Sequence, residues 1–202
     1  MQELSMNILD IAENSVRAGA SLVEITLTQD TAENRQTLTV RDNGKGMDAE
    51  MVAQVTDPFT TTRTTRKVGL GLPFLKMAAE QTGGGLVIDS TPGLGTTVTA
   101  SFTLGHIDLM PLGDIGGTIA ALVQSSCGDP AYRSAELAEA KDEIDFVFTF
   151  TRDGKTFAFS TKDARQILEG VPLSEPAVAV FIKDHITEGV QELTAGNQWL
   201  PD

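Results

Sequence analysis

Two short segments near the start of the chain alternate between apolar and polar residues, and this alternation limits the possible folds more than any other feature. Residues 22–28 and 37–41 each carry their apolar side chains on one face, at Val23, Ile25, Leu27, Leu38 and Val40. A period of two is typical of β-strands that bury one face and expose the other. The sequence therefore predicts a sheet that other elements cover on one side.

Helical segments and further strands surround this pair. In the first half we expect helices over residues 3–18, 49–55 and from 72 to the glycines at 83–85, and strands over 86–90 and 97–104. Gly19 suits the end of the first helix, and Pro73 suits the first turn of the third. Elements in this order predict an α/β fold, a two-layer sandwich of one sheet and one layer of helices.

The second half of the chain shows a different order of elements. We expect helices over residues 116–126, 135–143, 161–168 and 175–193, and a hairpin of strands over 145–151 and 155–160. Asp153-Gly154 is a strong indication of the two-residue turn in that hairpin. The sequence predicts a boundary at residues 105–113, which separates a domain over 1–104 from a smaller α+β domain over 105–202.

The chain is acidic, and its charge is unevenly distributed. The net charge is −13. Residues 1–104 hold 8 Lys/Arg against 12 Asp/Glu, which gives −4, and residues 105–202 hold 7 against 16, which gives −9. Nucleic-acid phosphates repel such a chain, so we expect no nucleic-acid partner. The acidic second half, with its helices and hairpin, predicts instead that residues 105–202 bind a protein partner.

Three features bear on the cellular compartment. The N-terminal segment lacks a basic start followed by an apolar core, so it does not resemble a signal peptide. No apolar run approaches the roughly 20 residues that span a bilayer, and we expect no membrane partner. The single cysteine, Cys127, excludes an intramolecular disulfide and suits a reducing compartment. Together these features predict a cytoplasmic protein.

Asp42 continues the phase of Leu38 and Val40, so its carboxylate points toward the covered face of the sheet. A carboxylate in that position needs a partner. Thr96 falls in phase with the apolar residues of a neighbouring strand, which brings a hydroxyl into the same layer. Such a pair can read the amino group and ring nitrogen of an adenine. Alternatively, it is a buried hydrogen-bonded pair without a ligand.

Two glycine-containing segments accompany this pair. Gly44 and Gly46 allow a sharp turn and the close approach of a ligand, although Asn-Gly is also a common plain turn. Gly69-Leu70-Gly71-Leu72 leads into a predicted helix, whose first amides can bind phosphate. The alternative is a helix entrance in which the glycines serve only the backbone.

The residues before this second glycine segment are rich in hydroxyl and basic groups in an otherwise acidic chain. Thr62, Arg63 and Lys67 are the candidate phosphate ligands among residues 60–67, because charged hydrogen bonds to phosphate are strong. The alternative is a solvated loop without a ligand.

The first helix carries a polar stripe of Asp10, Asn14 and Arg17, in which Asp10 and Asn14 lie one helical turn apart. An amide oxygen at Asn14 and a nearby carboxylate can bind hydrated Mg²⁺ and orient a water molecule. The alternative is the ordinary solvated face of a helix.

Five motifs occur together along the first half of the chain: Asn14 in the first helix, Asp42-x-Gly44-x-Gly46, Asp57-Pro58-Phe59, Gly69-x-Gly71 and Gly95-Thr96. In this combination, residues 5–104 resemble the superfamily of DNA gyrase, heat-shock chaperones, histidine kinases and mismatch-repair ATPases. Residues 9–20 are similar to the mismatch-repair proteins, whereas residues 57–74 and 83–102 are closer to bacterial sensor histidine kinases.

The resemblance implies a Bergerat-type α/β sandwich that binds ATP and Mg²⁺. It implies that Asp42 binds the adenine, with support from Thr96, and that Asn14 holds the metal. The amides of the segment from Gly69 to Gly71, with Leu70 and Leu72 beside them, are implied on the phosphates.

The chain departs from the family pattern in two respects. Hydrolytic members carry a glutamate one turn before the metal-binding asparagine, and this chain has the shorter Asp10 there, which predicts absent or slow hydrolysis. Sensor kinases carry a phosphoacceptor histidine on a helical hairpin before this domain, and the first motif lies too near residue 1 for that hairpin. We expect structural or surface roles for His106 and His185, the two histidines.

These features leave three functions open. The first is a cytosolic kinase that phosphorylates a separate protein. The second is an ATP-dependent conformational switch whose partner binds residues 105–202. The third is an ATPase that uses Asp10 as its general base. We favour the kinase, and a homodimer is compatible with each function.

Overall fold

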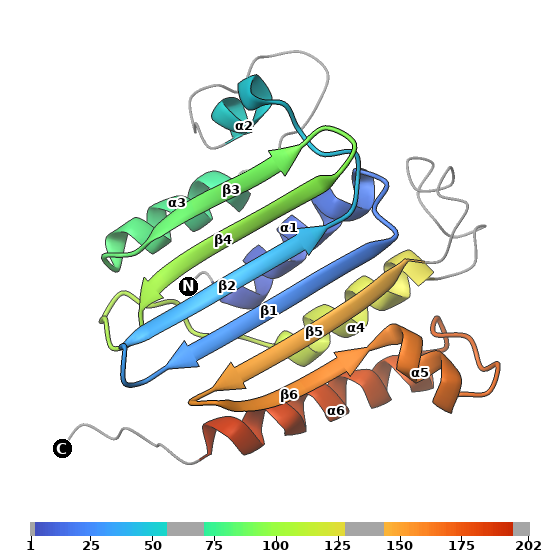
Figure 1. The fold of residues 1–202 in the computed structure, drawn as a ribbon. Coiled ribbons are helices and arrows are strands. Elements are labelled where there is room, and N and C mark those ends of the chain that lie inside the picture. Colours follow the sequence, from blue (N-terminus) through green and yellow to red (C-terminus); the bar gives the residue numbers. More distant parts are fainter. Residues whose placement is uncertain (1–2, 56–70, 128–143, 196–202) are drawn as a thin grey trace.

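The computed structural model describes residues 3–55, 71–127 and 144–195, and Figure 1 shows its fold. The strands are β1 (Leu22–Asp30), β2 (Arg35–Asp42), β3 (Gly85–Thr91), β4 (Gly95–Thr103), β5 (Asp145–Arg152) and β6 (Lys155–Ser160). The helices are α1 (Leu4–Arg17), α2 (Ala49–Val55), α3 (Gly71–Gln81), α4 (Ile115–Cys127), α5 (Thr161–Ile167) and α6 (Pro176–Thr194). The strands form one sheet in the order β3-β4-β2-β1-β5-β6.

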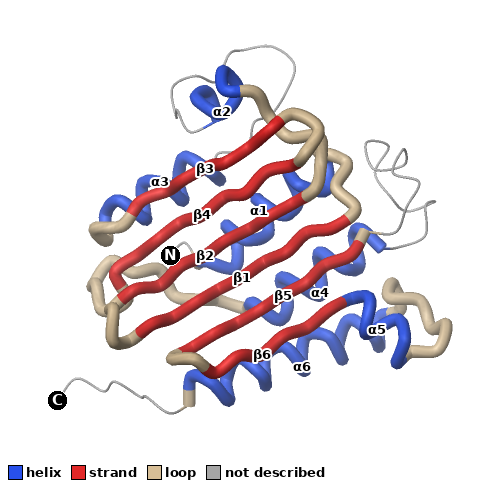
Figure 2. The backbone as a smooth tube through the Cα atoms, in the orientation of Figure 1, coloured by secondary structure: helices blue, strands red, loops and turns tan. Residues whose placement is uncertain are grey.

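The helices α1, α3, α4 and α6 cover one face of this sheet, as Figures 1 and 2 show. Burial alternates along the strands as the sequence predicts, with every second residue of β1 buried. The opposite face is polar, and two of its threonine hydroxyls, those of Thr39 and Thr99, lie 3.5 Å apart across β2 and β4. The predicted two-layer α/β sandwich is therefore confirmed.

The register of the sheet places Asp42 at a fixed point. In the antiparallel pairs, Asp42 lies opposite Val23 of β1 on one side and opposite Thr96 of β4 on the other. Asp42 is the last residue of β2, so the chain leaves the sheet directly after it. The end of a central strand thus carries a carboxylate on the helix-covered side.

The second half of the chain continues the same sheet. Strand β5 pairs in parallel with β1, so that Phe146, Phe148 and Phe150 lie opposite Val23, Ile25 and Leu27. A parallel pair needs a long crossover connection, and α4 lies within it. The predicted boundary at residues 105–113 therefore separates two parts of the chain that share one sheet.

The segment between the two halves also contacts α1. The amide of Leu4 donates to the carbonyl of Pro111 at 3.0 Å, and that of Ser5 donates to the carbonyl of Leu112 at 3.0 Å. One hydrophobic core combines residues of both halves, including the fully buried Phe146, Phe148 and Phe150. Burying each such side chain contributes roughly 1.5–3 kcal/mol.

The C-terminal end of α1 lies close to the end of β2. Its buried residues recur at helical spacing, and Gly19, at φ +76°, ends it with its amide bonded to the carbonyl of Val16. Glycine adopts this left-handed conformation without steric cost. The last turn of α1 lies beside Asp42, to which its Ser15 hydroxyl donates a hydrogen bond.

The predicted helices and strands in the described residues are confirmed, with ends that shift by one or two residues. Shifts of two residues occur in the β1–β2 hairpin, where β1 runs to Asp30 and β2 begins at Arg35 because their backbone pairing continues to the turn, and at Gly95, the start of β4. The predicted helix over 135–143 lies outside the described residues.

Candidate functional site

The carboxylate of Asp42 is the centre of the candidate site. Asp42 is 8% exposed, and its Oδ1 accepts hydrogen bonds from the backbone amides of Gly44 at 2.9 Å and Thr96 at 3.3 Å. Its Oδ2 accepts a hydrogen bond from the Ser15 hydroxyl at 2.7 Å. Three donors from three separate segments thus hold one buried carboxylate in a fixed orientation.

This arrangement follows from the turn after β2. The amide of Gly44 can reach back to Asp42 because the chain turns immediately, and Gly46 completes the turn at φ +65°. A side chain on Gly46 would collide with the carbonyl of Thr91, so this position requires glycine for packing between two loops. Gly46 is therefore required by the backbone conformation and by the close packing of the two loops.

The carboxylate retains hydrogen-bonding capacity. An ionised carboxylate accepts about four hydrogen bonds, and three are made within the described residues. The remaining lone pair belongs to Oδ2 and can accept a hydrogen bond from an amine or hydroxyl group of a ligand. An ionised carboxylate has no hydrogen to donate. A ligand that placed a carbonyl oxygen against Oδ2 would therefore form no hydrogen bond there, which is unfavourable.

Thr96 supports Asp42 through its backbone. The amide of Thr96 donates to Oδ1 of Asp42, and the Thr96 hydroxyl lies 2.9 Å from that of Ser90. Asp42 and Thr96 are direct partners across β2 and β4, so their side chains lie on the same face of the sheet. The support that the Thr96 hydroxyl would give to an adenine stays a prediction. The hydroxyl pair with Ser90 ties β3 to the same end of the sheet.

Asn14 lies one residue before Ser15 and is partly exposed. Its Oδ1 accepts a long hydrogen bond of 3.4 Å from Arg17, whose guanidinium also contacts Glu13 at 2.8 Å. An amide oxygen held this weakly can bind Mg²⁺, which prefers oxygen ligands and usually keeps several waters or phosphate oxygens. No group of three acidic, histidine or cysteine side chains that could hold a metal occurs within the described residues. Asn14 therefore fits a metal that brings its other ligands with it.

Asp10 lies one turn before Asn14 and packs against the start of α3. A Cβ atom built on Gly71 would come within 2.9 Å of both Cβ and Oδ2 of Asp10. The pKa of Asp10 is raised, because partial burial disfavours its charged form and the Glu13 carboxylate lies nearby, while Arg17 acts in the opposite direction. A carboxylate with a raised pKa beside a helix start is a reasonable general base.

The start of α3 is the remaining part of the site within the described residues. Gly71 and Leu72 are buried in its first turn. Other predicted site residues lie outside the described residues, namely Gly69, Leu70, Thr62, Arg63, Lys67 and the motif Asp57-Pro58-Phe59. Asp10 of α1 packs against the start of α3, and Ser15 of α1 binds Asp42. The predicted phosphate and adenine subsites therefore both lie beside α1.

Ser15 is a functional candidate that the sequence analysis missed. It is 3% exposed and lies in phase with the buried Ile8, Ile11 and Ala12 of α1. A serine on the apolar face of a helix must have a hydrogen-bond partner inside the protein. The helical spacing places Ser15 on the apolar face, so the sequence could have indicated that this serine has a buried hydrogen-bond partner. It could not have indicated that the partner is Asp42.

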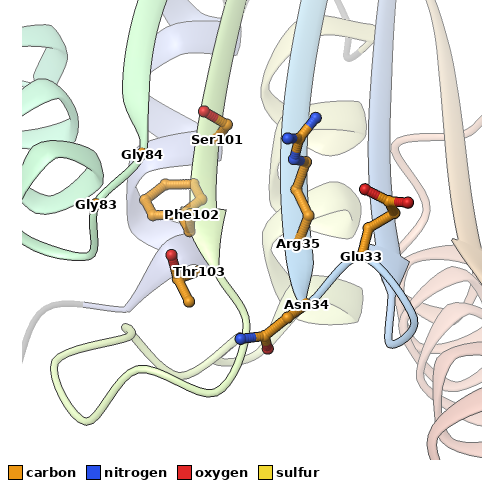
Figure 3. A pocket seen from close by; sticks show the side chains of 8 residues that line it. All are labelled: Glu33, Asn34, Arg35, Gly83, Gly84, Ser101, Phe102 and Thr103. Atoms are coloured by element: carbon orange, nitrogen blue, oxygen red, sulfur yellow. The ribbon is translucent and has the colours of Figure 1, made fainter.

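A polar hollow of about 280 Å³ lies at the other end of the sheet. Figure 3 shows its lining, which comes from the β1–β2 hairpin, the end of β4 and the turn before β3, and includes Arg35 and Thr103. Arg35 and Asp42 lie seven residues apart at opposite ends of β2, which corresponds to roughly 24 Å. The hollow contains none of the predicted site residues.

No helix in the described part of the chain has the length and apolar character needed to cross a membrane.

A family model of histidine kinase-, DNA gyrase B-, and HSP90-like ATPases matches residues 2–106 of this chain. A putative NtrY-like sensor histidine kinase of Rickettsia conorii is 29% identical over 109 residues, which cover 54% of this chain and 18% of the relative. The sensor protein SrrB of Staphylococcus aureus is 34% identical over 102 residues, which cover 48% of this chain and 17% of the relative. The matched region thus spans less than a fifth of the length of these relatives.

Among solved structures, the chain is similar to the N-terminal domain of a DNA repair protein. The TM-score is 0.52 at 15% identity, and the similarity covers 78% of this chain and 52% of the other. At this identity the similarity concerns the fold alone.

Proposed function

The chain belongs to the family of histidine kinase-, DNA gyrase B-, and HSP90-like ATPases, and on this basis we propose that it binds ATP with Mg²⁺ and phosphorylates a separate protein. The observation that carries the proposal is the buried carboxylate of Asp42, which three fixed donors orient and which keeps one acceptor position open within the described residues. The 6-amino group of adenine supplies the matching donor.

The other site residues take complementary roles in this proposal. Asn14 holds Mg²⁺ through its Oδ1, and the ion offsets the negative charge of the phosphates. The first amides of α3, beginning at Gly71, face the phosphates, because unpaired amides at a helix start favour anions. Thr62, Arg63 and Lys67 are proposed as further phosphate ligands.

The positions of the two histidines support a separate protein as the phosphate acceptor. His106 follows the end of β4, whereas Asp42 pairs with Thr96 near its start, so roughly 24 Å of strand separates them. His185 lies on α6 and stacks on Phe181 with a ring-centroid distance of 5.8 Å. Neither residue lies near the proposed nucleotide site, so transfer to them within one molecule is geometrically unfavourable.

The protein partner is proposed to bind the second half of the chain. Four exposed large apolar residues gather around its last two helices, namely Ile167, Val171, Val180 and Phe181, with exposed fractions between 47% and 74%. They lie on or between α5 and α6 at the β6 edge of the sheet, whereas Asp42 lies on the inner strand β2 (Figure 1).

Hydrolysis of ATP is the second candidate function, and one observation favours it. Asp10 lies against Gly71 at the proposed phosphate end, with a raised pKa that suits a general base. The reaction would transfer a proton from water to Asp10 as the water attacks the γ-phosphorus, with ADP as the leaving group. A switch that binds ATP without chemistry is the third candidate.

One experiment separates these functions. The protein is incubated with Mg²⁺ and ATP labelled on the γ-phosphate, beside Asp42→Ala and the control Asp89→Ala, which changes an exposed aspartate of β3. Label that passes to an added protein supports the kinase, whereas free phosphate supports hydrolysis. Bound, unchanged ATP supports the switch. If Asp42→Ala binds ATP as tightly as the parent, the proposed nucleotide site is wrong.

A further inference from the structure

Ser15 is the one side chain among the described residues that contacts the Asp42 carboxylate through a side-chain hydrogen bond. The residue is 3% exposed, and its hydroxyl oxygen lies 2.7 Å from Oδ2 of Asp42 and 3.3 Å from the carbonyl oxygen of Ile11. A hydroxyl has a single hydrogen to donate. The shorter contact to a charged acceptor is the stronger one, so the hydrogen belongs to Asp42.

The other two donors to Asp42 are backbone amides. They come from Gly44 and Thr96 and both bind Oδ1, so they fix one oxygen of the carboxylate. Oδ2 depends on Ser15 alone among the described residues, and Oδ2 also holds the open lone pair. Ser15 therefore holds the oxygen that is proposed to face the ligand.

We propose that Ser15 is the positioning residue that sets the preference of this site for a base carrying an amino group over one carrying a carbonyl at the same position. The inference rests on the proposed binding of ATP. With Ser15 in place, Oδ2 only accepts hydrogen bonds at a fixed point, which matches the 6-amino group of adenine and opposes the 6-carbonyl of hypoxanthine or guanine.

Loss of the hydroxyl removes this constraint. In Ser15→Ala, Oδ2 loses its only donor within the described residues, so the carboxylate is freer to rotate. A rotated carboxylate no longer presents its open lone pair at the point proposed for the 6-amino group, and it opposes a 6-carbonyl there less strongly. The substitution weakens binding of the amino base more than binding of the carbonyl base.

The test compares ATP with inosine triphosphate, which differs from ATP in the base through a carbonyl in place of the 6-amino group. Dissociation constants for both are measured by calorimetry on the full chain and on Ser15→Ala, Ser15→Thr and Ser126→Ala. The last variant is the matched control, because Ser126 is also a buried helical serine, at 3% exposure, but lies on α4. Thermal unfolding of each variant reports its folding independently.

We expect Ser15→Ala to bind ATP about tenfold more weakly, the usual effect of losing a hydrogen bond to a charged group. The affinity for ATP relative to that for inosine triphosphate should fall by up to that factor, Ser15→Thr should retain the parent ratio, and Ser126→Ala should leave it unchanged. An equal loss for both nucleotides, or no loss for either, would show that Ser15 only supports the fold and would overturn the inference. If the parent chain binds neither nucleotide, the proposed function itself fails, and this inference fails with it.

Discussion

At the scale of single residues, the proposed site depends on two neighbouring side chains of α1. Ser15 faces the core and binds Asp42, whereas Asn14 is partly exposed and has a weak contact to Arg17. Successive residues of a helix point about 100° apart, so one turn of α1 supplies a buried polar contact and an open oxygen ligand. The base and metal subsites are therefore positioned by the same turn.

The metal assignment predicts a selective effect of Asn14→Ala. The substitution should remove most of the increase in ATP affinity that Mg²⁺ produces, because the amide oxygen is the proposed protein ligand of the ion. Affinity without Mg²⁺ should change little. Calorimetric titrations with and without Mg²⁺ measure both values, and Asp89→Ala, an exposed residue of β3, is the control. If Mg²⁺ strengthens binding equally in the variant and the parent, Asn14 is not the ligand.

The hydrolysis function predicts that Asp10→Asn stops phosphate release while ATP still binds. Asparagine has nearly the same size as aspartate and fits beside Gly71, but it cannot accept a proton from water. In the parent, release should fall as the pH decreases through the pKa of Asp10. Because that pKa is raised, the decrease should begin at a higher pH than for an ordinary aspartate. Equal release by variant and parent would assign the base to another residue.

At the scale of secondary-structure elements, α4 connects the two halves of the chain and is anchored at its start. The Asp114 carboxylate accepts a hydrogen bond from the amide of Gly117 at 2.8 Å and lies 3.2 Å from Nζ of Lys183 on α6. Both contacts favour the charged form and lower the pKa of Asp114, the hydrogen bond from Gly117 most strongly. One exposed side chain thus caps α4 and links it to α6.

This anchor predicts that Asp114→Ala lowers the free energy of unfolding by about 1 kcal/mol, the usual cost of losing a helix cap. The pKa is lowered in the folded state, so the contribution is present above the unfolded pKa near 3.8 and is lost as the pH falls through the folded pKa. Urea unfolding near neutral pH and near pH 3 measures this dependence. Asp114→Asn, which keeps an acceptor for Gly117, should lose less. A variant as stable as the parent at neutral pH would contradict the capping role.

At the scale of the whole molecule, the second half completes the sheet that carries the site. The family match ends at residue 106, yet the similarity to the solved DNA repair domain covers 78% of this chain and so extends into the second half. Strand β5 occupies the edge of β1, and α4 and α6 cover the same face as α1. The proposed partner surface on α5 and α6 therefore belongs to the same folded unit as Asp42.

Because the two halves share one sheet, we predict that a chain ending at residue 104 does not fold cooperatively. The truncation removes three fully buried phenylalanines of β5, each contributing roughly 1.5–3 kcal/mol, and leaves the backbone of β1 unpaired along one edge. That loss is comparable to the total stability of a typical domain, roughly 5–15 kcal/mol. Circular dichroism during urea unfolding checks this. A cooperative transition together with ATP binding would instead establish residues 1–104 as an independent domain.

The sequence by itself determined the elements and the direction of Asp42. Period-two and helical spacing are local properties of the chain, so they identified the strands and helices and placed the Asp42 carboxylate on the covered face, where it is found. The Asp153-Gly154 turn likewise fixed the β5–β6 hairpin. Each of these features depends on neighbouring residues and on the backbone geometry that they favour.

Only the tertiary structure decided how distant segments meet. The parallel pairing of β5 with β1 joins residues more than 100 positions apart, and no local pattern encodes which edge a later hairpin extends. The same holds for the hydrogen bonds that Ser15 and the Thr96 amide donate to Asp42. Hydrogen bonds of this kind depend on side-chain orientation and strand register, which packing of the whole chain fixes.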